Sequence, residues 1–142
     1  VLQSRRQQVN LNNMPVRDAY ISSNFGYRAD PITGRTAFHG GIDFAGPEGT
    51  DVFAVAPGIV TFAGIRSGYG NVVEINHGDN MTTRYAHARN LVVKAGDMVA
   101  KDQLVAYMGS TGRSSGPHLH YEVMRNGTQV DPSGYIAHVA HR

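Results

Sequence analysis

The sequence predicts an all-β domain, a compact antiparallel sandwich or barrel with short helical segments only at its two ends. Short apolar runs recur along the chain, and Gly, Pro, Asn or Asp separates them. Glycine accounts for 17 of 142 residues, whereas about 7% is usual. Frequent glycine without a low-complexity repeat indicates many tight turns, and therefore many short strands.

The N-terminal segment is expected to lie outside this domain. Residues 1–18 are polar with widely spaced apolar positions, which indicates a linker or the end of a helix, then an extended arm after Pro15. The chain starts at Val1 without a signal-peptide pattern, so we expect a portion of something longer. The folded domain is expected over 19–136, followed by a tail at 137–142.

The strands follow in chain order. A strand and turn are expected at 19–28, and a loop at 29–34, which contains a proline and a glycine. The stretch NHGDN at 76–80 joins two alternating runs and predicts a hairpin. Further strands are expected at 51–56, 58–65, 70–77, 80–88, 90–96, 102–109 and 118–127.

The composition excludes several classes of protein. The net charge of +2 is compatible with an anionic polymer as partner, but it is too small for the basic footprint of a nucleic-acid-binding protein. No apolar run reaches the length of a membrane-spanning helix. Because the chain has no cysteine, any metal ion must be bound by His, Asp or Glu.

Alternation along two strands assigns side chains to faces. In HLHYEV, His118, His120 and Glu122 share one side, with apolar residues on the other. In NMTTRYAHA, the same rule places Tyr85 and His87 on a common face. The paired imidazoles of the first strand should therefore project together into one site.

The second informative segment is TAFHGGIDFAGPEGT. His39 and Asp43 lie in an apolar setting, where each must be paired, hydrogen-bonded or bound to a metal ion. We interpret the two intervening glycines as a bend that lets both side chains converge. With one histidine of the pair His118/His120, they make three N/O ligands, the number in a catalytic zinc site. A two-histidine, one-carboxylate iron site is the alternative metal centre, but it leaves His87 unexplained.

The motifs HGGID, YAH and GPHLHYEV, in that order, resemble the signatures of the M23 zinc metallopeptidases, the lysostaphin and LytM-type cell-wall endopeptidases. The resemblance runs from about Tyr20 to Tyr135. It implies the lysostaphin-like β fold with its duplicated hybrid motif and a groove over one Zn²⁺. It also implies metal ligands at His39, Asp43 and His120.

The resemblance further implies that His118 and His87 are the catalytic histidines that do not bind the metal. We expect His118 to be the general base for a metal-activated water. His87 would stabilise the oxyanion or pass a proton to the leaving amine. Tyr85 either orients this ring and contacts substrate, or packs across the strands.

Four other positions each allow two interpretations. Arg113 and Ser115, with Ser114 between them, either line the groove or only form the turn before the HxH strand. Glu122 either supports the metal ligands or is simply exposed.

The resemblance implies a peptidoglycan hydrolase. The segment SSNFGYRADPITG looks most like Gram-negative members, which cut the D-Ala–meso-diaminopimelate link of stem peptides. We therefore expect a periplasmic or cell-envelope monomer, attached to or autoinhibited by an upstream segment. The alternatives are a catalytically silent LytM-like regulator or peptidoglycan-binding module, and a glycine-bridge endopeptidase.

Overall fold

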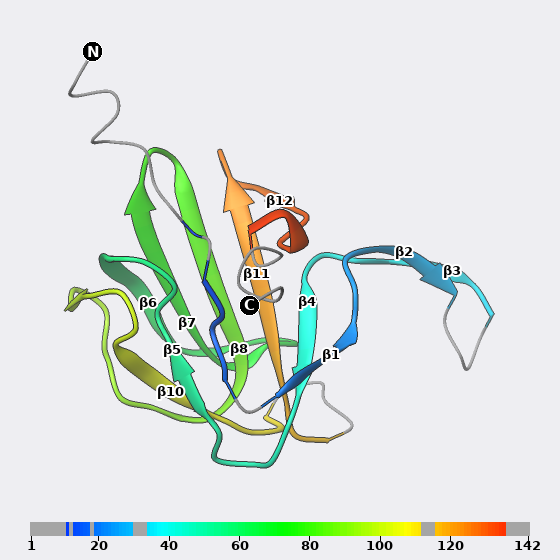
Figure 1. Ribbon diagram of the computed structural model, residues 1–142, viewed down its shortest axis with the longest axis horizontal. Helices are drawn as coiled ribbons and strands as arrows, with labels where there is room; N and C mark the ends of the chain where they lie inside the picture. Colours follow the sequence, from blue (N-terminus) through cyan, green and yellow to red (C-terminus); the bar gives the residue numbers. More distant parts are fainter. Residues whose placement is uncertain (1–10, 12, 18, 30–33, 112–115, 136–142) are drawn as a thin grey trace.

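The computed structural model describes residues 11, 13–17, 19–29, 34–111 and 116–135 (Figure 1). It confirms the all-β class, since every strand pair is antiparallel and a short helical turn at 133–135 follows the last strand. The strands are β1 (Tyr20–Ser23), β2 (Gly26–Ala29), β3 (Thr36–His39), β4 (Ile42–Ala45), β5 (Asp51–Phe53), β6 (Gly58–Arg66), β7 (Gly70–Gly78), β8 (Met81–Leu91), β9 (Met98–Val99), β10 (Leu104–Met108), β11 (His118–Arg125) and β12 (Thr128–Val130).

Ten strands form one curled sheet, in the order β1-β4-β11-β8-β7-β6-β9. Strand β10 pairs with both β5 and β8, and β12 pairs with β11. Strands β2 and β3 make a separate hairpin that projects from the body of the molecule (Figure 1). The order places β4 directly beside β11, although the two are far apart in sequence. This neighbourhood unites the two segments that carry the predicted metal ligands.

Strand β8 is bent at His87, and the bend shapes the whole sheet. Residues before it pair with β11, whereas Ala88 and Leu91 pair with β10. His87 has a positive φ of 65°. Two residues of β8 there oppose a single residue of β7, between the pairs Asn71–Ala88 and Val73–Tyr85. This β-bulge breaks the alternation and turns the next side chain to the other face.

The bulge corrects one expectation. Regular alternation would have kept Tyr85 and His87 on a common face, but Tyr85 packs in the core and His87 lies with the other histidines. On β11 the alternation holds, because Leu119 and Tyr121 are buried on the side opposite the paired imidazoles. The rings of Tyr85 and Tyr121 meet across the strands with centroids 5.4 Å apart. Such pairs add about 0.5–1.5 kcal/mol beyond their buried area.

The core also includes part of the segment that was expected to be a linker. Leu11 and Val16 are fully buried. The carbonyl of Pro15 accepts a hydrogen bond from the backbone N–H of Phe53 at 2.8 Å. The packed part of the chain therefore reaches at least to residue 11, beyond the expected boundary at 19.

Several turns and strand ends can be compared with expectation. The hairpin at 76–80 is confirmed, with positive φ at both Asp79 and Asn80, as a two-residue turn of this type requires. The run at 90–96 is not a strand of its own, since its first two residues complete β8. Strands β3, β4, β9 and β12 were not expected. Asn126 and Gly127, a strong hairpin signal, form the turn between β11 and β12.

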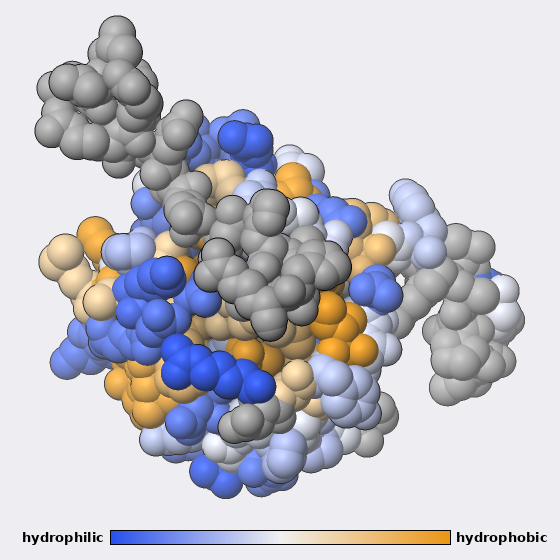
Figure 2. All heavy atoms as spheres, viewed as in Figure 1, coloured by the Kyte–Doolittle hydropathy of each residue, from blue (hydrophilic) through white to orange (hydrophobic). Residues whose placement is uncertain are grey.

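Hydrophobic and hydrophilic atoms are interspersed on the face shown in Figure 2. Within the described ranges, we find no helix with the length and apolar character that a membrane crossing requires.

Candidate metal centre

Three side chains from three strands converge on one point. Asp43 of β4 and His120 of β11 are register partners, and His39 is the last residue of β3. One potential ligand atom of each lies within 4.8 Å of the others. His39 Nε2 is 3.2 Å from Asp43 Oδ2, and His120 Nδ1 is 2.8 Å from Asp43 Oδ1. The three side chains are 11%, 16% and 12% exposed, so the cluster is partly buried yet reachable.

Hydrogen bonds on the far side of each ring orient the two imidazoles. His39 Nδ1 donates to the carbonyl of Asn24 at 2.8 Å, and His120 Nε2 donates to Glu122 Oε2 at 2.7 Å. These bonds direct Nε2 of His39 and Nδ1 of His120 toward Asp43. A metal-binding histidine almost always has such a partner on its second nitrogen. The donor set therefore fits a divalent cation in its chemistry and in its support.

The pKa values of Asp43 and His120 also indicate that the cluster favours a positive charge. Burial alone would lower the pKa of His120, but hydrogen bonds to Asp43 and Glu122 outweigh it and raise the pKa to about 9. Burial would raise the pKa of Asp43, but hydrogen bonds from His120 and His39 hold it well below its ordinary value. Without a metal ion, protonated His120 thus carries the charge that the carboxylates require, and metal binding must displace its Nδ1 proton.

Two more histidines stand beside the cluster. The ring centroids of His87 and His118 are 4.6 Å apart, and that of His87 is 6.0 Å from His120. His87 Nδ1 donates to the carbonyl of Thr111 at 2.7 Å, and His118 Nδ1 to that of Gly116 at 3.0 Å. In these tautomers the basic nitrogen is Nε2. Burial lowers the pKa of His87, although the bond to Thr111 opposes this, so its ring is neutral near pH 7.

The two glycines after His39 lead through the expected bend, which falls at Gly41, and they also permit close approach of the strands. Neither has a positive φ. A Cβ on Gly41 would come within 2.4 Å of the carbonyl oxygen of Tyr121, and a Cβ on Gly40 within 2.4 Å of Gln129. Because backbone oxygen cannot move aside, a side chain at Gly41 would push β4 away from β11 and separate Asp43 from its partner.

The sequence did not single out two further residues of this face, Tyr69 and Arg84. Glu122, whose role was left open, is only 1% exposed. It accepts hydrogen bonds from His120, from the Tyr69 hydroxyl at 3.1 Å and from Arg84 Nη1 at 2.7 Å. Glu122 therefore supports the ring of His120, one of the predicted metal ligands. The alternation of HLHYEV could have found it, and an arginine between Thr83 and Tyr85 in the middle of a predicted strand could have drawn attention to Arg84.

The structure places Tyr85 away from the site. It is fully buried, and its hydroxyl lies 2.8 Å from that of Thr83 and accepts the backbone N–H of Val55 at 3.2 Å. It packs across the strands and neither contacts the His87 ring nor faces a substrate. Arg113 and Ser115 lie outside the described residues.

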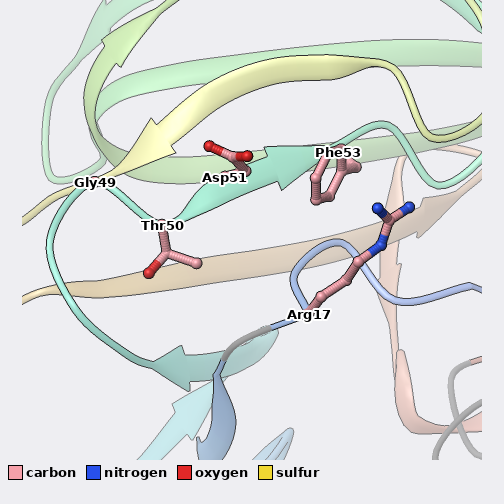
Figure 3. A pocket seen from close by; sticks show the side chains of 5 residues that line it. All are labelled: Arg17, Gly49, Thr50, Asp51 and Phe53. Atoms are coloured by element: carbon pink, nitrogen blue, oxygen red, sulfur yellow. The ribbon is translucent and has the colours of Figure 1, made fainter.

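The positions of two surface hollows can be compared with that of the predicted metal cluster, which lines neither of them. One, of about 300 Å³, adjoins Thr111, the hydrogen-bond partner of His87. Its lining residues are Ile65, Arg66, Ser67, Gly68, Gly70, Asn71 and Thr111. The other, of about 360 Å³, contains none of the predicted site residues (Figure 3). It is lined by Arg17, Gly49, Thr50, Asp51 and Phe53. Its one cation, Arg17, already lies over the Phe53 ring and pairs with Asp102.

Known proteins are similar to this chain in sequence. The chain is 46% identical over 121 residues to DD-carboxypeptidase/endopeptidase Mpg of Neisseria meningitidis, covering 85% of this chain and 28% of that protein. It is 44% identical over 112 residues to peptidoglycan DD-endopeptidase ShyA of Vibrio cholerae, covering 78% of this chain and 26% of that protein. The chain thus spans about a quarter of the length of these relatives.

Solved structures are also similar to this chain in fold. A zinc-containing peptidase from Vibrio cholerae superposes with a TM-score of 0.79 at 38% identity, covering 87% of this chain and 38% of that one. The catalytic domain of lysostaphin from Staphylococcus simulans superposes with a TM-score of 0.74 at 32% identity, covering 82% and 91%. The sequence model of Peptidase family M23 matches residues 37–132, which include all five histidine and aspartate positions of the site. The chain belongs to Peptidase family M23.

Proposed function

We propose that the chain is a zinc-dependent endopeptidase that hydrolyses peptide cross-links of peptidoglycan. The observation that carries the proposal is the convergence of His39, Asp43 and His120 within 4.8 Å, with His87 and His118 alongside. Three protein ligands with a further position for water or substrate are characteristic of catalytic rather than structural zinc.

Zinc suits the donor set of two imidazoles and one carboxylate. When bound, it would polarise the scissile carbonyl and lower the pKa of a water molecule to about 7. The chain supplies the rest. Asp43 provides negative charge at the centre, and the backbone carbonyl of Asn24 and the Glu122 carboxylate fix the two rings that face it.

The remaining two histidines would accept and donate protons. We assign the general base to His118, which presents Nε2 as its basic nitrogen beside the ligand His120. His87, kept neutral near pH 7 by burial, accepts a proton before it can donate one to the leaving amine or to the oxyanion. A base in this position contributes about 10²–10⁴-fold to the rate.

The relatives supply the substrate class. Two are named as endopeptidases with DD specificity, one of them explicitly for peptidoglycan. We therefore propose the D-Ala–meso-diaminopimelate link of stem peptides as the scissile bond, and the periplasm as the location. A monomer that works as part of a longer polypeptide fits the share of the relatives that the chain spans.

The test is a digestion of purified sacculi by the purified chain, with and without a chelator, followed by mass spectrometry of the muropeptides. We expect cross-linked species to decline, the decline to stop with chelator, and added zinc to restore it. A glycine-bridged wall provides the contrast for bond specificity. Unchanged cross-linking by zinc-loaded protein would contradict the proposal and favour a silent regulator. Activity that requires ferrous iron and a 2-oxoacid and ignores zinc would favour the alternative iron centre, which is typical of non-haem iron oxygenases.

A further inference from the structure

We propose that Arg84 is a positioning residue of the metal centre: it fixes the Glu122 carboxylate, which in turn fixes the His120 ring with Nδ1 toward the metal. The hydrogen bonds of Arg84 go to Glu74, Tyr69 and Glu122 and to none of the three predicted ligands, and Arg84 lies on β8, a strand that contributes no ligand. The inference rests on the metal centre of the proposed function and deepens it.

Strand register creates a line of alternating charge across three neighbouring strands. Arg84 of β8 is the cross-strand partner of Glu122 on β11 and of Glu74 on β7. Arg84 Nη1 lies 2.7 Å from Glu122 Oε1, and Arg84 Nε lies 2.8 Å from Glu74 Oε2. Arg66 also pairs with Glu74. The line therefore runs from Arg66 at the end of β6 to the predicted ligand His120.

Each oxygen of Glu122 has its own partners. Oε1 accepts from Arg84, while Oε2 accepts from His120 Nε2 at 2.7 Å and from the Tyr69 hydroxyl at 3.1 Å. The side chain is 2% exposed, so water offers no substitute. A buried carboxylate is tolerated only when it is paired and hydrogen-bonded. Arg84 is the cation that pairs with this buried carboxylate and holds it in place beside His120.

Only an arginine meets the geometry of this position. Its guanidinium donates from Nε to Glu74 and from Nη1 to Glu122, and Nη1 also lies 3.0 Å from the Tyr69 hydroxyl. A lysine would keep the charge, but its single ammonium cannot reproduce this planar fork. The Tyr69 ring, with its centroid 4.9 Å from Arg84 Cζ, covers the guanidinium.

Loss of Arg84 should therefore act on the metal through two intermediates. Glu122 would be left buried without its cation and would shift away from His120. The His120 ring would then lose the acceptor that holds Nε2–H, and its Nδ1 would no longer be fixed toward the metal. Loss of such an outer partner typically lowers metal affinity by about 10–100-fold.

The experiment measures zinc affinity by competition with a chromophoric chelator for wild type, Arg84→Met, Arg84→Lys and Arg125→Met. Arg125 is exposed at the end of β11 and serves as the matched control. We expect affinity to fall about 10–100-fold for Arg84→Met, by less for Arg84→Lys, and not at all for Arg125→Met. Long-range ¹H–¹⁵N spectra of the zinc-loaded protein should show the His120 proton on Nε2 in wild type and a weakened or mixed signal in Arg84→Met.

A double-mutant cycle with Glu122→Gln separates positioning from mere stability. If Arg84 acts through Glu122, the two losses of zinc affinity are far from additive. The double variant removes both charges of the Arg84–Glu122 pair and leaves neither one unpaired. If Arg84→Met does not fold, the double variant and Arg84→Lys test the positioning role in its place. Unchanged zinc affinity in folded Arg84 variants, or additive losses, would overturn the inference. Failure of the wild-type chain to bind zinc would instead remove the metal centre itself.

Discussion

Strand β8 carries two buried polar networks, one on each face, and they differ in kind. On one face Arg84 joins Glu74 and Glu122 in a charged line that ends on His120. On the other face the hydroxyls of Thr83 and Tyr85 lie 2.8 Å apart. His77 extends this second network, with Nε2 2.7 Å from Thr83 Oγ1. The networks occupy successive residues of one strand and point in opposite directions.

The second network is neutral and complete within the protein. His77 Nδ1 donates to the carbonyl of Pro57 at 2.8 Å, so its Nε2 is the acceptor for the Thr83 hydroxyl. The Tyr85 hydroxyl accepts the N–H of Val55. Burial lowers the pKa of His77, against the bonds to backbone carbonyls, which keeps the ring uncharged. This network satisfies buried groups and needs no ligand.

The charged network differs because it ends at a group with a second task. His120 bonds to carboxylates through both ring nitrogens, and one of these bonds must give way when a cation binds. The comparison therefore separates polar residues that stabilise the fold from those that prepare a site. Substitutions on one face should change metal binding, and those on the other should change stability.

The largest expected effect is that of Asp43→Asn. The amide keeps the shape of the side chain but removes the negative charge between His39 and His120. We expect zinc affinity to fall by more than about 100-fold, beyond the usual loss from an outer partner, and hydrolysis of sacculi to fall to background. Chelator competition and muropeptide analysis measure both. Retention of one zinc per chain at near wild-type affinity would show that Asp43 is not a ligand.

Next in size is the effect of His118→Ala, which should separate catalysis from metal binding. His118 lies beside the cluster but is not one of its three members. We expect activity to fall about 10²–10⁴-fold, as for loss of a general base, while zinc content stays at one per chain. Metal analysis after gel filtration supplies the second measurement. If zinc is lost in proportion to activity, the roles of His118 and His120 are reversed.

The sequence could predict for a physical reason that these polar side chains lie together. Strand alternation fixes which residues of β11 share a face, and the structure keeps His118, His120 and Glu122 there. An aspartate and a histidine in an apolar segment must find partners, and His39 and Asp43 find them in the same cluster. Such local rules require no knowledge of which strands are neighbours.

What the sequence could not provide depends on pairing between distant strands. The bulge at His87 arises because β8 changes partner from β11 to β10, and no pattern within β8 encodes that change. The importance of Arg84 appears only when β11 and β7 supply a carboxylate on each side. The need for Gly41 follows from the approach of the Tyr121 carbonyl, which lies on another strand. The prediction that Tyr85 shares a face with His87 was wrong because of the same bulge.

A smaller effect is expected for Tyr85→Phe on the neutral face, and it should change stability rather than zinc affinity. The change removes the acceptor of the Val55 N–H, which is buried, and a partner of Thr83. We expect the free energy of unfolding to fall by about 1–3 kcal/mol, measured by urea denaturation, with zinc affinity within about twofold of wild type. A marked loss of zinc affinity without loss of stability would mean that the two faces are coupled, and the comparison would fail.

The smallest expected effect is a pH dependence of stability that arises from His77. The pKa of His77 in the folded protein lies below its ordinary value of 6.5, because burial disfavours the charged ring. Between the two values the unfolded state binds more protons, so the free energy of unfolding falls as pH drops from about 6.5 through the folded pKa. The loss is at most about 1.4 kcal/mol for each unit of separation.

His77→Gln should flatten this dependence, since an amide does not titrate and can still bond to Thr83. Urea unfolding of both proteins at several pH values between about 7.5 and 5, with chelator present, isolates the difference because His87 and His120 titrate equally in both. Parallel curves would show that His77 does not change its protonation on unfolding. The network of His77, Thr83 and Tyr85 would then accommodate a charged ring, as the network of Arg84 and Glu122 does. The two faces of β8 would differ only in their geometry.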